Sequence, residues 1–168
     1  SPNPLISSTT PDIKTEDWKK RSCGIVALAM LLGYYKKKVH PETLLEKEVV
    51  HTYLPGIGWK HKALAHIAKK YGLRGKNFDW ARTHNGEAFQ KLQKYIAHYP
   101  IIASVYPHFN PQRNGGHLIV LTGMTPHTIT FNDPDALRRR TIKKTVSVTQ
   151  FLIGWKKRII VIYPKKAP

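Results

Sequence analysis

The feature that most constrains the fold is an apolar run, CGIVALAMLLGYY, at residues 23–35. Ile25, Leu28 and Leu32 fall on one stripe at helical spacing, and the other faces of the run are almost as apolar. Ser22, directly ahead of the run, is a residue type that caps helix N-termini. Because a helix that is apolar on nearly every face has to be buried, the sequence predicts a central helix that begins directly after Ser22.

The rest of the chain divides into a helical first part and a strand-rich second part. Further helices are expected from Pro41 onward, near 60–71 up to Gly72, and over 87–98 behind a cap at Asn85. Short β-branched runs follow at 101–106, 117–123, 128–133 and 158–163, with a short helix capped by Ser147 before the last of them. Helices followed by antiparallel strands are typical of an α+β fold.

The N-terminal segment, residues 1–15, is rich in Pro, Ser and Thr and is expected to be an extended arm. Residues 16–168 are expected to form a single domain with its own core. No stretch approaches the roughly 20 apolar residues of a transmembrane segment, and there is no signal-peptide core. The sequence starts at Ser1 without a methionine, so the compartment stays open between a cytoplasmic protein and an exported one whose targeting segment is missing from this chain.

The charge is strongly positive, with 28 Lys and Arg against 10 Asp and Glu, a net charge of +18. Such a field attracts nucleic acid, anionic surfaces or acidic peptides, although a solvated surface from a lysine-rich proteome explains it equally well. A nucleic-acid partner is not favoured, because no zinc finger, RNP signature or Gly-rich RNA-binding loop accompanies the charge. The single cysteine excludes an intramolecular disulfide and any zinc site built from several cysteines.

That cysteine, Cys23, is the first candidate for chemistry. At a helix N-terminus, unpaired N–H groups and the helix dipole stabilise a thiolate, and the basic run 19–21 precedes it. Gly24 would let a substrate backbone approach closely. On this motif alone, a buried structural cysteine is the more favoured interpretation.

A nucleophilic cysteine needs a histidine, and His117 differs from the other eight. It begins an apolar strand directly after Gly115 and Gly116, which keep its approach clear for a substrate. The strand would fix its backbone while the ring faces a cleft. The alternative is a histidine that makes its hydrogen bonds within the core, and the sequence favours neither interpretation.

A third residue would orient the imidazole, and Asp133 is the candidate. It closes the next strand, and antiparallel pairing of 117–123 with 128–133 would place it beside His117. Asp135 is the competitor, but it follows Pro134 and is expected to belong to the turn.

Together, the segments SCGIVALAMLLGYY, GGHLIVLTG and FNDPDA resemble the motifs of bacteriocin-processing peptidases that cut after a double-glycine leader, and of their papain-like relatives. The resemblance runs from about Asp17 to Tyr163. It implies a bacterial protein with a papain-like fold, in which an N-terminal helical lobe with a central cysteine-bearing helix packs on a C-terminal antiparallel sheet. It also implies Cys23 as nucleophile, His117 as base and acid, and Asp133 as the residue that orients His117. Members of this family need no metal and no diffusible cofactor.

One position departs from the family pattern. Such enzymes are expected to carry a glutamine six residues before the cysteine, whose amide donates to the oxyanion beside the backbone N–H of the cysteine. Asp17 occupies that position here. The transporter portion often fused to leader peptidases is also absent, so a double-glycine substrate is not assumed.

Four functions remain open from the sequence. The first is a cysteine peptidase, a thiol hydrolase that cleaves peptide or isopeptide bonds through an acyl-enzyme. The second is a papain-like acyl transferase or deamidase, because water and amines attack the same thioester. The third is a catalytically weakened peptide-binding domain, and the fourth is a basic nucleic-acid binder. The expected partner is a peptide or protein substrate that carries acidic residues, given the positive field.

Overall fold

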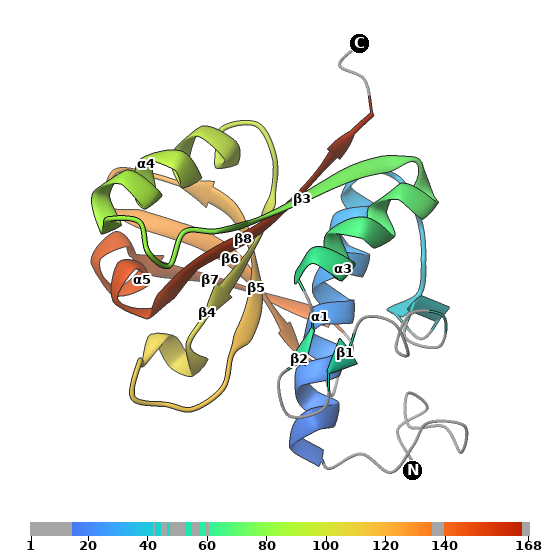
Figure 1. Ribbon diagram of the computed structural model, residues 1–168, viewed down its shortest axis with the longest axis horizontal. Helices are drawn as coiled ribbons and strands as arrows, with labels where there is room; N and C mark the ends of the chain where they lie inside the picture. Colours follow the sequence, from blue (N-terminus) through green and yellow to red (C-terminus); the bar gives the residue numbers. More distant parts are fainter. Residues whose placement is uncertain are drawn as a thin grey trace.

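A six-stranded antiparallel sheet forms the centre of the computed structural model, in the order β3-β8-β4-β5-β6-β7 (Figure 1). The structure describes residues 15–41, 43, 44, 47, 53, 54, 58, 59, 61–135 and 140–165. The strands of the sheet are β3 (Leu73–Asp79), β4 (Ile101–Val105), β5 (His117–Met124), β6 (Thr128–Asp135), β7 (Arg140–Ser147) and β8 (Trp155–Pro164). A separate two-stranded sheet pairs β1 (Tyr53–Leu54) with β2 (Gly58–Trp59).

Helices lie on both sides of the large sheet, with α1 and α3 on one side and α4 and α5 on the other (Figure 1). Their bounds are α1 (Thr15–Tyr34), α3 (His61–Ile67), α4 (Asn85–Ile96) and α5 (Val148–Gly154), with 3-10 turns η1 (Ala68–Tyr71) and η2 (Pro107–Phe109). Pro41, Thr43, Leu44 and Lys47 are helical as well.

Alternate residues of the central strands face two separate cores, as the pleat of a sheet requires. Toward α1 and α3, the sheet contributes residues such as Ile102, Val120 and Ile160. Toward α4 and α5, it contributes Ile101, Ile119 and Val161. The side chains of β4 are buried along its whole length, so this strand is covered on both faces.

The central position expected for the apolar run is confirmed. Leu28, Leu31 and Leu32 of α1 are completely buried in the first core. Removing each such side chain from water contributes about 1.5–3 kcal/mol, which makes α1 a principal element of the core.

The N-terminus of α1, however, differs from the prediction. The helix begins at Thr15, so Ser22 lies inside it and is not its N-cap. Glu16 and Asp17 put negative charge into the first turn, where the helix dipole favours it, and neither Pro nor Gly interrupts 15–22. The arm predicted for residues 1–15 otherwise lies outside the described residues.

Several other helix boundaries can be compared with the sequence. Gly72 ends the 60–71 segment with the left-handed backbone (φ +75°) typical of a C-cap, as predicted. The Ser147 hydroxyl accepts a hydrogen bond from the N–H of Gln150, which confirms that cap. The cap of α4 is His84 instead of Asn85, because its Nδ1 accepts from the N–H of Gly86.

The four predicted strands are present as β4, β5, β6 and β8. Two long edge strands were not predicted, because LRGKNFD (β3) and RTIKKTVS (β7) are polar and highly charged. Their backbone pairing with β8 and β6 decides their conformation instead. Across the described part of the chain, none of the helices is both long and apolar enough to cross a membrane.

Candidate active site

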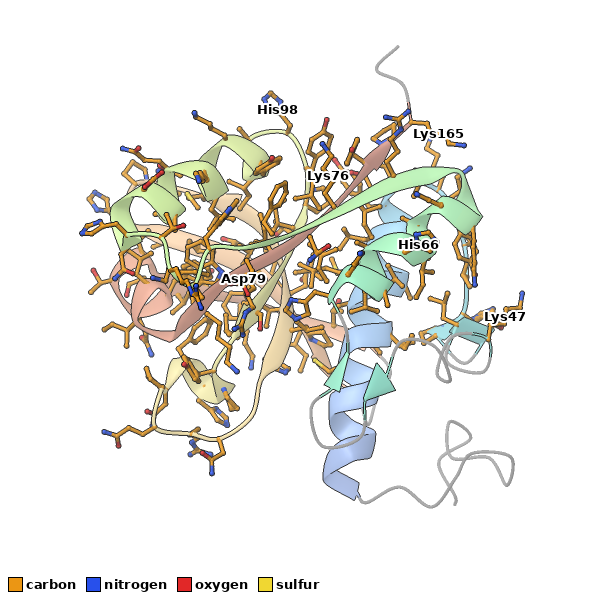
Figure 2. The ribbon with its side chains drawn as sticks, viewed as in Figure 1. Lys47, His66, Lys76, Asp79, His98 and Lys165 are labelled. Carbon is orange, nitrogen blue, oxygen red and sulfur yellow. The ribbon has the colours of Figure 1, made fainter. Side chains whose placement is uncertain are left out.

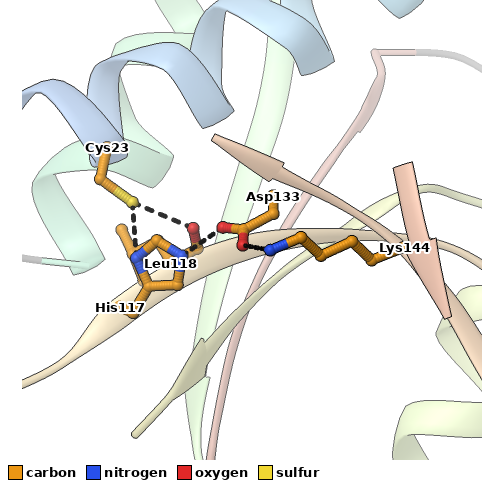
Figure 3. Close-up of polar contacts among 5 residues, drawn as sticks. All are labelled: Cys23, His117, Leu118, Asp133 and Lys144. Atoms are coloured by element: carbon orange, nitrogen blue, oxygen red, sulfur yellow. Dashed lines mark hydrogen bonds and ion pairs between the residues drawn. The ribbon is translucent and has the colours of Figure 1, made fainter. Parts of the chain in front are cut away.

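Cys23 and His117 meet where α1 passes the beginning of β5 (Figure 3). The Cys23 Sγ lies 3.1 Å from the Nδ1 of His117 and 3.1 Å from the backbone oxygen of Leu118, to which the thiol can donate. Cys23 is 6% exposed, and it sits inside α1 instead of at its N-terminus. The stabilisation of a thiolate expected from a helix N-terminus is therefore not available here, and the contact with His117 takes its place.

Asp133 contacts the other nitrogen of the same imidazole. His117 begins β5 opposite Val105 of β4, which fixes its backbone in the interior of the sheet. The His117 Nε2 and the Asp133 Oδ1 form a hydrogen bond, so the pairing of β5 with β6 brings the two residues together as predicted. Because Asn132 is opposite Val120, Asp133 is two positions away from the point opposite His117, and the contact is diagonal across the two strands.

Lys144 adds a fourth residue to the contacts among Cys23, His117 and Asp133. Its Nζ lies 2.9 Å from the Asp133 Oδ2, and it projects from β7, the edge strand beside β6 (Figure 3). Sequence reasoning did not find Lys144, because β7 was not predicted. The alternation of Ile142, Lys144 and Val146 was the signal that could have placed it on one face of a strand.

The electrostatics of the site favour a charged imidazole. Burial alone would disfavour the imidazolium, but the negative charge of Cys23 and the hydrogen bond to Asp133 outweigh it and raise the pKa of His117 to about 10. Burial also works against the carboxylate of Asp133. Its hydrogen bond to His117, the charge of His117 and the contact with Lys144 nevertheless hold the pKa of Asp133 below its usual value. The arrangement thus supports an imidazolium on His117 between the Cys23 sulfur and an ionised carboxylate.

A cavity of about 1080 Å³ opens beside these residues. Cys23, His117 and Asp133 line it, and β5, β6 and β7 provide an apolar wall with Ile119, Phe131, Ile142 and Val146. Phe109 of η2 also lines the cavity and contacts Phe131 edge to face, with 5.5 Å between ring centroids. The cavity is large enough for several side chains of a bound peptide.

The loop ahead of His117 is fixed by Lys156. Its Nζ donates to the backbone oxygen of Gly115 at 2.8 Å and lies 4.7 Å from the ring centroid of Tyr106. Gly115 has φ +90°, a conformation that side chains rarely allow, and a Cβ on Gly116 would come within 3.2 Å of the Lys156 amine. Both glycines line the cavity.

The other predicted residues lie elsewhere. Gly24 is buried within α1 and is not among the residues that line the cavity. Asp17 belongs to the first turns of α1, and its side chain lies outside the described part. Asp135 ends β6 opposite Arg140, so it is part of the strand and not of the turn. Within the described residues, no cluster of three or more His, Cys, Asp or Glu side chains could hold a metal ion.

Three solved structures with a similar fold are peptidase or peptidase-like domains. The peptidase domain of Streptococcus ComA, a bifunctional ABC transporter of quorum sensing, has a TM-score of 0.60 at 21% identity, covering 93% of this chain and 97% of its own. The corresponding domain of Streptococcus mutans ComA has a TM-score of 0.51 at 21% identity, with 92% and 98% covered. The peptidase C39-like domain of a toxin-secretion ATP-binding protein from Vibrio parahaemolyticus has 0.55 at 14% identity, with 85% and 97% covered.

These likenesses establish the papain-like fold that the sequence motifs implied. Among curated proteins, none matches the chain. The model of the Peptidase_C39 like family, by contrast, matches residues 9–159, which is most of the sequence. The chain therefore belongs to the peptidase C39-like family.

Proposed function

We propose that the chain is a cysteine peptidase that cleaves peptide or isopeptide bonds through an acyl-enzyme on Cys23. The observation that carries the proposal is the 3.1 Å contact between the Cys23 Sγ and the His117 Nδ1 at the wall of a large cavity. Membership in the peptidase C39-like family supports it, as does a solved complex of the Streptococcus mutans ComA peptidase domain with a small-molecule inhibitor.

In the first half of the reaction, the Cys23 thiolate attacks the carbonyl carbon of the substrate, and the carbonyl π electrons move onto oxygen. When this oxyanion collapses, the C–N bond breaks and the Nδ1 proton of His117 passes to the leaving amine. The product is a thioester on Cys23 and a neutral His117.

In the second half, His117 Nδ1 takes a proton from water as the water oxygen attacks the thioester carbon. The C–S bond then breaks, its electrons return to sulfur, and the thiolate–imidazolium pair is restored. Asp133 accepts the hydrogen bond from the Nε2–H throughout, which holds the ring in place and stabilises its charged form.

Acidic side chains near the cleaved bond would suit this site. Lys144 lines the cavity, and the chain carries a net charge of +18. Turnover of an acidic peptide at low substrate concentration should fall as salt rises, because charges are screened beyond roughly 10 Å at 0.1 M ionic strength. A neutral peptide of the same length is the control, and equal salt dependence of the two would contradict acidic preference.

The decisive experiment is cleavage of a diverse peptide library, with new termini identified by mass spectrometry. Wild type should produce new termini and a covalent acyl adduct with an activated ester, whereas Cys23→Ala and His117→Ala should produce neither. Adding a primary amine separates hydrolase from acyl transferase, because a transferase converts the thioester into an amide. Cleavage that survives Cys23→Ala, or a folded wild type with no adduct, would overturn the proposal.

A further inference from the structure

A second cavity, of about 650 Å³, lies between β3 and α4. Because β3 forms the opposite edge of the sheet from β7, this cavity is separate from the candidate active site beside β5, β6 and β7 (Figure 1). Its aromatic lining consists of Phe78, Trp80, Tyr95 and Tyr99, and its cationic lining of Lys91, Lys94 and His98. We call it the aromatic cavity.

Three rings of the aromatic cavity, those of Phe78, Trp80 and Tyr95, contact one another. Phe78 stacks on Trp80 with 5.3 Å between ring centroids and contacts Tyr95 at 5.1 Å. Tyr99, which also lines the cavity, contacts Tyr163 of β8 with 5.8 Å between ring centroids. Phe78, Tyr95 and Tyr99 are only partly buried, so part of each side chain is accessible to a ligand.

Cations border the rings on both sides. On α4, the Lys91 amine lies 5.8 Å from the centroid of Trp80, and Lys94 is exposed one helical turn further along. On β3, Lys76 shares a face with Phe78, and its amine lies 5.9 Å from the centroid of Tyr163. Figure 2 shows Lys76 on β3 and His98 beyond the end of α4.

Acidic side chains are largely kept away from this surface. Asp79 follows Phe78 in β3, so it faces the other side of the sheet, where it pairs with Arg158. The nearby Glu87 forms an exposed contact of 3.7 Å with Lys91. None of the described residues that line the aromatic cavity is acidic.

We propose that the aromatic cavity binds single-stranded nucleic acid, with bases on its rings and phosphates on the bordering lysines. A ligand here has to bring flat apolar groups as well as repeated negative charge, and each nucleotide supplies both. An acidic peptide supplies the charge, but most of its residues would leave the rings uncovered. The net charge of +18 adds long-range attraction for a polyanion. The proposal does not depend on peptidase activity.

The test measures fluorescence anisotropy of a labelled oligouridylate of about 12 nucleotides, within the range of site sizes known for single-strand binders. The protein is the full chain carrying Cys23→Ala, so that the outcome is independent of catalysis. An abasic oligomer of equal length keeps the phosphates without the bases, and a polyglutamate peptide of equal charge replaces both. The oligouridylate should bind at least about tenfold more tightly than either.

Two variants separate charge from stacking. Lys91→Gln/Lys94→Gln should lower the slope of log affinity against log salt by about two, since each lost phosphate contact removes about one unit. Tyr95→Leu should weaken binding about tenfold with little change in slope, because it removes a ring and no charge. The matched control is Lys62→Gln/Lys69→Gln, which removes the same charge from α3 and η1 on the other side of the sheet.

The control pair should retain both the affinity and the slope to within about twofold, and thermal unfolding should establish that every variant is folded. Equal losses in the two lysine pairs would overturn the proposal, since binding would then follow the overall charge. Equal binding of the abasic oligomer would overturn it as well. Tighter binding of polyglutamate, lost in Lys91→Gln/Lys94→Gln, would make the cavity a site for acidic peptides instead.

Discussion

The Asp133 carboxylate is shared between His117 and Lys144, whose Nζ lies 2.9 Å from the Asp133 Oδ2. A cation from the edge strand therefore neutralises part of the charge that would otherwise act on the imidazole. The Lys144 side chain is 50% exposed, so water weakens this effect without removing it. The pair lets us predict how the site responds to single changes of charge.

Lys144→Met should move the alkaline limb of kcat/KM to higher pH. With the lysine charge removed, Asp133 stabilises the imidazolium more strongly, although the shift should stay below about one pH unit for so exposed a pair. The control is Lys143→Met, which removes the same charge from the opposite face of β7. If both variants shift the profile equally, Lys144 acts only through the overall field of the protein.

The His117 imidazole should titrate near pH 10 in the wild type. Its pKa is raised to about 10 despite burial, chiefly by the charge of Cys23 and the hydrogen bond to Asp133. In Cys23→Ser the thiolate is gone and burial persists, so the pKa should fall strongly. NMR of the imidazole Cε1 proton across pH measures both. The proton should therefore stay on His117 through neutral pH in the wild type and leave it at lower pH in the variant.

The Cys23 thiol should react with iodoacetamide faster in wild type than in His117→Ala, because its Sγ lies 3.1 Å from the His117 Nδ1. In His117→Ala this contact is lost, so alkylation at the same pH should be slower. The rate of alkylation, followed by mass spectrometry, is the measurement. An identical rate in both proteins would identify Cys23 as a residue of the core and nothing more.

Asp133→Asn should preserve the fold and reduce turnover strongly. An amide holds the ring less firmly and cannot stabilise its charged form; the comparable loss in serine triads is about 10⁴. A thiolate–imidazolium pair is expected to tolerate the change better. Asp135→Asn is the control on the same strand, and a larger loss in that variant would contradict the assignment of Asp133. Turnover of a cleaved library peptide is the measurement.

Asp17→Gln should increase acyl-enzyme formation at least about tenfold, if position 17 lies beside the oxyanion, because one lost donor costs about 10²–10³ in rate. An ionised carboxylate can only accept hydrogen bonds, whereas the amide can donate. Burst kinetics with an activated ester measure the effect. A clear loss would show that Asp17 has a role of its own, and no change would place it outside the site.

The fit of α3 against β3 can be tested separately from the chemistry. A Cβ on Gly75 would come within 2.0 Å of the Ala65 backbone oxygen, so Gly75→Ala should lower the free energy of unfolding by about 1–3 kcal/mol or more. Gly33→Ala in α1 meets nothing within 4 Å and should raise it by up to about 1 kcal/mol. Urea unfolding of the two variants compares them directly.

The sequence predicted those elements whose local pattern and packing agree. The apolar run of α1 and the β-branched β5 and β6 each have a clear period, and their pairing was enough to bring Asp133 to His117. The predicted start of α1 was wrong. Ser22 is a residue type that caps helices well, but the acidic Glu16 and Asp17 favour the first turn of a helix, and this preference was overlooked. β7, and with it Lys144, was missed because backbone pairing with β6 outweighs its polar composition. The Lys156 contact with Gly115 joins residues 41 apart in sequence, a distance at which no local pattern operates.

The separation of the site residues along the chain also has a consequence for synthesis. Cys23 and His117 are 94 residues apart, and Asp133 follows His117 by another 16. A nascent chain exposes its thiol early, but this thiol has no imidazole partner until β5 has emerged and paired. The imidazole in turn has no carboxylate to orient it until β6 has followed. Since domains generally complete folding as units, the order of translation leaves Cys23 without the residues that would activate it until the chain is nearly complete.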